Sequence, residues 1–122
     1  CHLYDDWHDQ LLCAKNMHEG DMAIAFSYSG LTQEVLDCTV EAQRHNCPVV
    51  AVTKVDGSSK LATMADAVLG VAASEPLVRS GAMASRMAQL MVVDALYAAY
   101  VASDYERATH VIKQNYIEKQ ER

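Results

Sequence analysis

Short apolar runs alternate with longer helical stretches along this chain, and that alternation limits the folds it can adopt. Met22–Ser27 is a short apolar run that suits a strand buried on both faces of a sheet. Pro48–Thr53 is the clearest strand in the chain, and Ala67–Val71 is a further one. The stretches between them carry apolar residues at helical spacing, which is typical of a parallel sheet connected by crossover helices. We therefore predict an α/β fold, with Cys1–Tyr4 as the end of one further strand.

Local start and stop signals place the predicted helices. A first helix covers Asp6–His18, and Gly20 lies where a helix C-terminus needs a residue that tolerates a positive φ. Apolar residues at helical spacing after Ser29 and Gly30 predict a second helix that ends near His45. The remaining predictions are a short serine-capped helix through Ala65, a long helix over Gly81–Ala102, and a last helix opened by a capping box of Ser103 and Glu106.

The composition suits one globular domain over residues 1–122. A length of 122 residues is enough to bury one core but too short for two independent ones. With 51% hydrophobic and 21% charged residues, the balance is globular rather than disordered. Ten Lys and Arg against 16 Asp and Glu give a formal net charge of −6, which disfavours nucleic acid and anionic membranes as partners of this domain. No stretch long enough to cross a membrane is free of charge, and no signal-peptide pattern is present.

The cysteines indicate a reducing compartment. Cys1, Cys13, Cys38 and Cys47 form no CxxC pair, and we interpret them as reduced thiols of a cytoplasmic protein. Cys38, His45 and Cys47 come closest to a zinc-ligand pattern, but no second ligand pair follows at zinc spacing. We predict no metal site.

The stretch Gly81–Ala102 is apolar almost all round, with Arg86, Gln89 and Asp94 as its strongly polar interior residues besides Ser85. A helix with so little polar surface must be covered on most sides. A second copy of the chain would cover it through a two-fold helical interface. The alternative is a core helix buried within the monomer. Both remain open at this point, and we favour a homodimer or higher homo-oligomer.

The segment between the strand Met22–Ser27 and the following helix carries the sharpest chemical signal. It places the hydroxyls of Ser27, Ser29 and Thr32 around Gly30, where the backbone must turn tightly. At the carboxyl end of a parallel strand, the first amides of the next helix point outward with partial positive charge. Hydroxyls and amides together can bind a phosphate there without a lysine.

Two alternatives to a phosphomonoester site exist for this segment. It lacks the second glycine and the Lys-Ser/Thr of a Walker A loop, and it lacks the GxGxxG of a dinucleotide loop, so a small phosphomonoester fits better than a nucleotide. The hydroxyls of Ser27, Ser29 and Thr32 could instead only cap the helix. The position at the carboxyl end of a strand, where open α/β sheets bind their ligands, favours an anion site.

The chain resembles a known family in several stretches. Gly20-Asp21, the strand after it and Ser27–Glu34 resemble the central signature of the sugar isomerase (SIS) domain, and Pro48–Thr53 continues that pattern. Later stretches resemble more narrowly the SIS domain of RpiR-type bacterial transcriptional regulators. The matching segments are Ser59–Ala62, Ala65–Leu69, Glu75, Arg79–Arg86, Gln89-Leu90 and Asp94–Tyr97, together with Asp6, His8 and Gln10.

This resemblance implies a three-layer α/β/α fold, flavodoxin-like, that binds a phosphosugar and dimerises, without a cofactor. It implies that the hydroxyls of Ser27, Ser29 and Thr32 hold the phosphate, helped by the backbone amides of residues 28–31, which include those of Tyr28 and Gly30. It also implies that Glu75 faces the sugar and accepts hydrogen bonds from its hydroxyls. Without the resemblance, Glu75 would equally suit an exposed loop acid beside a proline.

We therefore expect the effector-binding and dimerisation domain of a DNA-binding regulator of carbohydrate metabolism. The family's first strand and a helix-turn-helix domain would precede Cys1, so DNA would be bound only through a domain outside this chain. The alternative is a sugar-phosphate isomerase or related lyase in which Glu75 is the base. We assign no catalytic residue, because no convincing partner for proton transfer accompanies Glu75.

Overall fold

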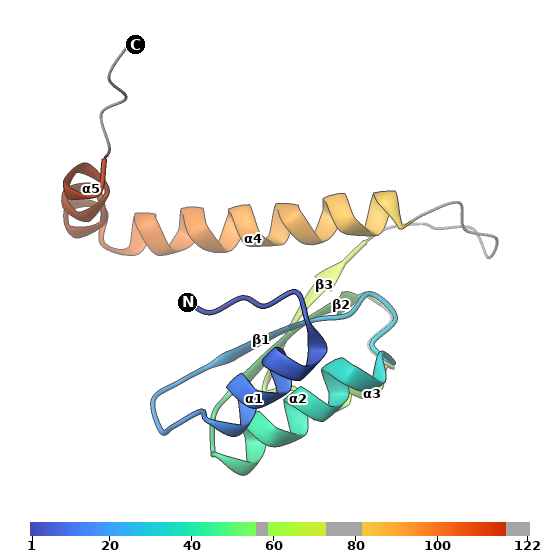
Figure 1. The fold of residues 1–122 in the computed structure, drawn as a ribbon. Coiled ribbons are helices and arrows are strands. Elements are labelled where there is room, and N and C mark those ends of the chain that lie inside the picture. Colours follow the sequence, from blue (N-terminus) through green and yellow to red (C-terminus); the bar gives the residue numbers. More distant parts are fainter. Residues whose placement is uncertain (56–58, 73–81, 117–122) are drawn as a thin grey trace, which may run out of the picture. The chain divides into compact units, whose positions relative to one another are not determined.

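The structure, a computed structural model, describes residues 1–55, 59–72 and 82–116 (Figure 1). It divides into two compact units, Cys1–Gln89 and Leu90–Arg122, which are described separately. Along the chain the elements are α1 (Trp7–Lys15), β1 (Ala23–Phe26), α2 (Gln33–Arg44), β2 (Val49–Lys54), α3 (Lys60–Met64), β3 (Ala67–Val71), α4 (Met83–Ser103) and α5 (Tyr105–Gln114).

The strands of the first unit form a parallel sheet in the order β1–β2–β3. Ala25 of β1 pairs with Ala51 of β2, which in turn pairs with Val68 of β3. Helix α2 connects β1 to β2, and α3 connects β2 to β3. Both connections join parallel neighbours through a helix, so the predicted α/β fold with crossover helices is confirmed.

The core of the first unit lies between the sheet and the helices α2 and α3. Leu36 of α2 and Leu61 of α3 meet Ala51 of β2 in one buried cluster, and Ala42 packs with Val49 in a second. Burial of each leucine side chain contributes about 2 kcal/mol to stability. Helix α1 packs against α2 (Figure 1). The packing of Leu36 and Ala42 on β2 holds α2 against the sheet, with its first turn following the carboxyl end of β1.

Two predictions near the N-terminus are wrong. Cys1–Tyr4 forms no strand, because a strand needs a neighbour to pair with; the Tyr4 carbonyl instead accepts a hydrogen bond of 2.7 Å from the Gln10 side chain. Helix α1 ends at Lys15 rather than near His18. Gly20 does adopt a positive φ, of 98°, but in a turn closed by the Asp21 amide and the His18 carbonyl rather than at the helix end.

The start of the last helix also differs from the prediction. Ser103 is the final residue of α4, and its hydroxyl donates to the Tyr100 carbonyl at 2.7 Å. Asp104 caps α5 instead, because its carboxylate accepts from the Arg107 amide at 3.2 Å. Serine and aspartate are comparable N-caps, so the residue type alone could not decide between these neighbours.

The second unit holds most of α4 and all of α5. Within it, no described residue from Leu90 to Tyr116 is buried. Large apolar side chains of α4 are exposed, among them Met91 at 71% and Tyr100 at 71%. Even so, none of the helices that the structure describes is long and apolar enough to cross a membrane. An apolar helix that is left exposed is the kind of surface that marks an interaction site.

Candidate functional site

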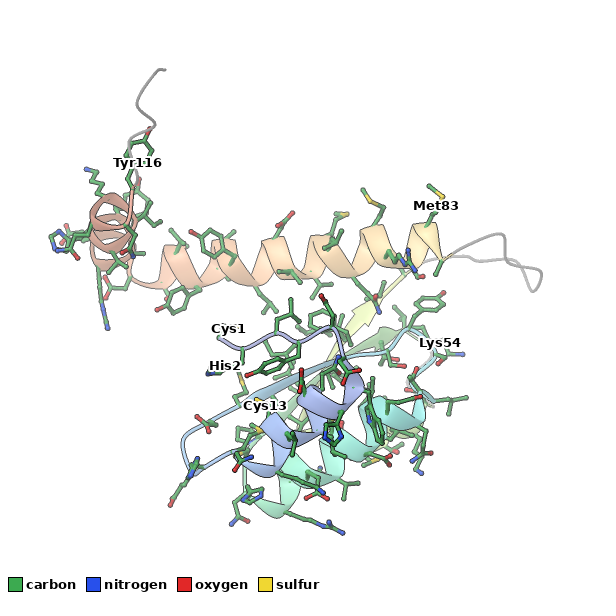
Figure 2. All side chains as sticks on the ribbon, viewed as in Figure 1. Cys1, His2, Cys13, Lys54, Met83 and Tyr116 are labelled. Carbon is green, nitrogen blue, oxygen red and sulfur yellow. The ribbon has the colours of Figure 1, made fainter. Side chains whose placement is uncertain are left out.

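The predicted hydroxyl segment is a loop between β1 and α2. Ser27 directly follows β1, and its amide donates to the Val52 carbonyl of β2 at 3.1 Å. The Tyr28 carbonyl accepts from the Lys54 amide, also at 3.1 Å. Lys54 lies at the carboxyl end of β2 (Figure 2). The loop is therefore held at the carboxyl edge of the sheet, where open α/β folds bind their ligands.

The hydroxyls of Ser27 and Thr32 meet inside this loop. Their oxygens lie 2.8 Å apart, and Ser27 is buried. The Gly30 amide donates to the Ser27 hydroxyl at 3.1 Å and to the Ser27 carbonyl at 3.0 Å. Together these bonds close a tight turn that brings the two ends of the loop together.

The loop hydroxyls do not cap α2. Thr32 occupies the N-cap position, but its side chain makes no capping hydrogen bond and contacts Ser27 instead. The Ser29 hydroxyl accepts from the Leu31 amide at 3.3 Å, and Leu31 precedes the helix. The capping alternative is thus not what the geometry shows. The first amides of α2, which have no intrahelical acceptor, keep their capacity to bind an anion.

Gly30 allows the close approach of two loops. Its φ is +65°, and a Cβ at this position would lie 2.2 Å from Ser59 Oγ and 3.0 Å from Thr53 Oγ1. A side chain here would therefore be strained in the backbone and would collide with Ser59. The predicted need for glycine at this turn is confirmed, with a steric cause in addition to the conformational one.

The structure adds two buried hydroxyls that were not predicted as site residues. Thr53 Oγ1 donates to the Tyr28 carbonyl at 3.3 Å and lies 3.5 Å from Ser59 Oγ. Ser59 also caps α3, as its hydroxyl accepts from the Ala62 amide at 3.2 Å. The signal that could have found Thr53 is its position near the carboxyl end of β2, the strand that neighbours β1, and for Ser59 it is the start of the helix that follows β2.

Of the predicted site residues, the structure brings together those of the loop. Ser27, Tyr28, Ser29, Gly30 and Thr32 all lie between β1 and the first turn of α2. Tyr28 is half-buried and Ser29 is exposed. The remaining predicted residue, Glu75, lies outside the described residues.

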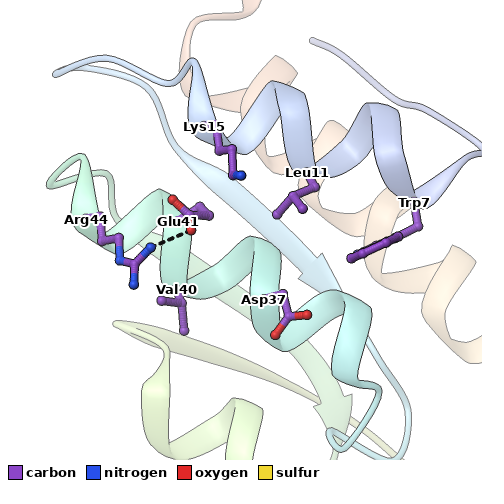
Figure 3. A pocket seen from close by; sticks show the side chains of 7 residues that line it. All are labelled: Trp7, Leu11, Lys15, Asp37, Val40, Glu41 and Arg44. Carbon is purple, nitrogen blue, oxygen red and sulfur yellow. Dashed lines mark hydrogen bonds and ion pairs between the residues drawn. The ribbon is translucent and has the colours of Figure 1, made fainter.

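A separate shallow pocket of about 340 Å³ lies between α1 and α2 (Figure 3). It is lined by Trp7 and Leu11 of α1 and by residues of α2 that include the Glu41–Arg44 ion pair. Its lining includes none of the hydroxyl-loop residues. It therefore offers no site for a ligand held by that loop.

The described cysteines are free thiols, as predicted. Burial, aided by the charge of Asp21, raises the pKa of the Cys47 thiol, which donates a hydrogen bond to the His18 carbonyl at 3.1 Å. Burial and the nearby Asp37 likewise raise the pKa of Cys38. Raised values keep both thiols protonated. In residues 1–55, 59–72 and 82–116, no group of three or more His, Cys, Asp or Glu side chains could hold a metal ion.

Comparison with known proteins gives consistent matches. Residues 4–99 match the protein family described as the SIS domain. An uncharacterized HTH-type transcriptional regulator of Caldanaerobacter subterraneus subsp. tengcongensis, TTE0211, is 41% identical over 86% of this chain, which is 37% of its own length. An uncharacterized HTH-type transcriptional regulator of Bacillus subtilis, YbbH, is 33% identical over 89% of this chain and 38% of its own length. The chain thus spans well under half the length of these relatives.

A solved structure is similar over nearly the whole chain. The NanR protein of Vibrio vulnificus, in complex with ManNAc-6P, matches 96% of this chain and 46% of its own with a TM-score of 0.76 and 27% identity. These matches confirm the resemblance stated from the sequence and the fold class that it implied.

Proposed function

The chain belongs to the SIS domain family, and we propose that it is the phosphosugar-sensing domain of a DNA-binding transcriptional regulator of carbohydrate metabolism. Relatives named as HTH-type transcriptional regulators support the regulatory role. The similar NanR structure was solved in complex with a sugar phosphate, which supports the ligand class. A sugar-phosphate isomerase was the alternative, and the names of these relatives do not favour it.

One observation carries the ligand assignment: the hydroxyls ahead of α2 are not used to cap that helix. They gather at the carboxyl edge of the sheet, beside the unpaired first amides of α2. Oxygen and nitrogen donors of this kind stabilise a phosphate dianion without a counter-charge from lysine.

In the bound state the phosphate lies over the loop. The hydroxyls of Ser29 and Thr32 donate to it, and the Ser27 hydroxyl orients that of Thr32. The backbone amides around Tyr28 and Gly30 and those of the first turn of α2 add their dipoles. Glu75 accepts hydrogen bonds from the sugar hydroxyls, as the family resemblance implies.

The domain acts as a homodimer through α4. Its large apolar side chains are exposed in the described chain, and burying them against a second copy contributes about 25 cal/mol for each Å² removed from water. DNA is bound by a helix-turn-helix region outside this chain, in the cytoplasm, where a bacterial regulator meets its operator.

Sensing requires that the sugar phosphate bind one dimer arrangement better than another, because a ligand with equal affinity for both would shift neither population. Helix α4 is the lever, since it connects the first unit, which carries the loop, to the dimer surface.

A thermal-shift panel on the full-length protein tests the ligand class. Sugar phosphates, including ManNAc-6P, are compared with their unphosphorylated sugars. At least one sugar phosphate is expected to raise Tm and to change operator affinity, while its unphosphorylated sugar does neither. A ligand that binds only the native state stabilises it by RT ln(1 + [L]/Kd), so the rise in Tm follows the affinity. Equal shifts for a sugar and its phosphate would contradict the phosphate assignment. A ligand that binds without changing operator affinity would contradict the sensing role.

A further inference from the structure

Thr53 and Ser59 form a buried pair behind the phosphate loop, with exposed fractions of 0% and 5%. We infer that these two residues position the loop: they hold the Tyr28–Ser29 peptide so that the Ser29 amide points to the phosphate. This inference rests on the proposed function. Neither side chain needs to touch the ligand, so both are positioning residues rather than part of the binding surface.

The hydrogen bonds of this pair have a defined direction. Thr53 uses its only hydroxyl proton to donate to the Tyr28 carbonyl at 3.3 Å. In its 3.5 Å contact with Ser59 it is therefore the acceptor, and Ser59 is the donor. Ser59 in turn accepts from the Ala62 amide at 3.2 Å. The chain of donors thus begins at the first turn of α3 and ends at the Tyr28 carbonyl.

The Tyr28 carbonyl fixes the direction of the next amide. It accepts from both the Thr53 hydroxyl and the Lys54 amide, so it is turned toward the end of β2. The described peptide bonds are all trans, and a planar trans peptide directs its C=O and N–H to opposite sides. The Ser29 amide therefore points away from β2. Among the described residues, the Ser29 amide has no hydrogen-bond acceptor.

A second contact holds the Gly30–Leu31 peptide in the same way. The Gly30 carbonyl accepts from the Leu61 amide of α3 at 3.0 Å, and Ser59 occupies the space that a Cβ on Gly30 would need. Both peptides that flank the Ser29–Gly30 pair are thus fixed by the end of β2 and the start of α3. A binding site held in advance spends less free energy on ordering its donors.

Thr53→Val tests the inference with little change in shape, since it replaces only the hydroxyl. Thr53→Ser restores the hydroxyl and serves as the rescue. The matched control is Thr39→Val, because Thr39 is also buried and its hydroxyl donates to the Val35 carbonyl within α2, at 2.9 Å. Removal of either hydroxyl is expected to lower Tm, so stability alone does not distinguish the two sites.

The readouts are the Kd for inorganic phosphate, from calorimetry on the full-length protein, and the NMR shift of the Ser29 amide in protein with isotope-labelled serine. Thr53→Val is expected to weaken phosphate binding about tenfold and to reduce the phosphate-induced shift of Ser29. Thr53→Ser restores both, and Thr39→Val changes neither. A Thr53→Val protein that loses Tm but keeps the wild-type Kd and the Ser29 shift would overturn the inference.

A further variant separates this failure from failure of the proposed function. Thr32→Val removes a hydroxyl that faces the ligand. Weaker phosphate binding in Thr32→Val together with wild-type binding in Thr53→Val would leave the phosphate site in place and reject only the positioning role. Wild-type protein that binds neither inorganic phosphate nor ManNAc-6P would reject both.

Discussion

The loop Ser27–Thr32 and helix α4 differ in how far their side chains find partners within this chain. At the loop, the buried hydroxyls of Ser27, Thr53 and Ser59 all have hydrogen-bond partners within the chain. Along α4, side chains such as Met83 and Met91 are apolar and exposed at 77% and 71%. The loop is thus held in place by bonds within the chain, whereas the apolar side chains of α4 have no such cover among the described residues, which is why we propose a ligand for the first and a second copy of the chain for the other.

The largest expected effect comes from filling the space at Gly30. Gly30→Ala combines a collision with Ser59 and an unfavourable positive φ, and we expect a loss of about 2–4 kcal/mol in the free energy of unfolding, measured by urea denaturation. Gly20→Ala is the control, because Gly20 also has a positive φ but no heavy atom within 4 Å of the added Cβ. Equal losses at both positions would show that the contact between the loops contributes nothing.

The next largest effect is expected from removing one hydroxyl that binds the phosphate. Ser29→Ala and Thr32→Val should each weaken sugar-phosphate binding by about 1–3 kcal/mol, the scale for a hydrogen bond to a charged group, as measured by calorimetry. Thr63→Val on α3 is the control, since its hydroxyl donates to the Lys60 carbonyl of the same helix. An equal loss of affinity for the unphosphorylated sugar would argue against phosphate contacts at these residues.

A charged residue introduced on the exposed apolar face of α4 should weaken self-association of the chain. Met91→Glu is expected to weaken self-association about tenfold or more in sedimentation experiments, because a buried unpaired carboxylate is costly. Leu3→Glu, at a residue that is 90% exposed in the first unit, should leave association unchanged. If Met91→Glu leaves self-association unchanged, the face of α4 that carries Met91 is not the dimer surface. Replacement of Arg86 or Asp94 is expected to weaken the dimer in the same assay.

The smallest expected effect is a pH dependence set by Cys47. Its thiol has a raised pKa in the folded protein because it is buried, so above the usual thiol pKa of 9.0 the unfolded chain loses this proton first. The contribution of Cys47 to the free energy of unfolding is therefore fully present below that pH, and it is lost as the pH rises further. Urea midpoints measured from neutral to alkaline pH should fall less steeply in Cys47→Ala than in wild type. Cys1→Ala should match wild type, and an unchanged slope in Cys47→Ala would remove Cys47 as the cause.

Local sequence patterns predicted most of the first unit. The strands β1, β2 and β3 were predictable because short apolar runs suit the strands of a parallel sheet. Burial on both faces, predicted for Met22–Ser27, is wrong for the described residues, since Ile24 and Phe26 of β1 are 42% and 38% exposed. Gly30 was predictable because a strand that turns into a helix within a few residues needs a positive φ. The prediction of a strand at Cys1–Tyr4 was wrong because pairing with a neighbour, rather than composition, decides whether a short segment is a strand.

The parts that were missed depend on tertiary register. Thr53 reaches the Tyr28 carbonyl only because β1 and β2 pair with Phe26 beside Val52, and no spacing within one segment encodes that pairing. The same holds for Ser59: a serine cap was predicted for the short helix without naming the residue, and the position of Ser59 beside Gly30 was not predicted. The absence of a capping bond at Thr32 likewise required coordinates, since threonine is a common N-cap.

A crystal structure of the full-length protein with the sugar phosphate that raises Tm most tests the central claim most directly. The account predicts phosphate oxygens within hydrogen-bond distance of the Ser29 amide and hydroxyl and of the Thr32 hydroxyl. A phosphate bound elsewhere, for example in the pocket between α1 and α2, with the loop unoccupied, would contradict it.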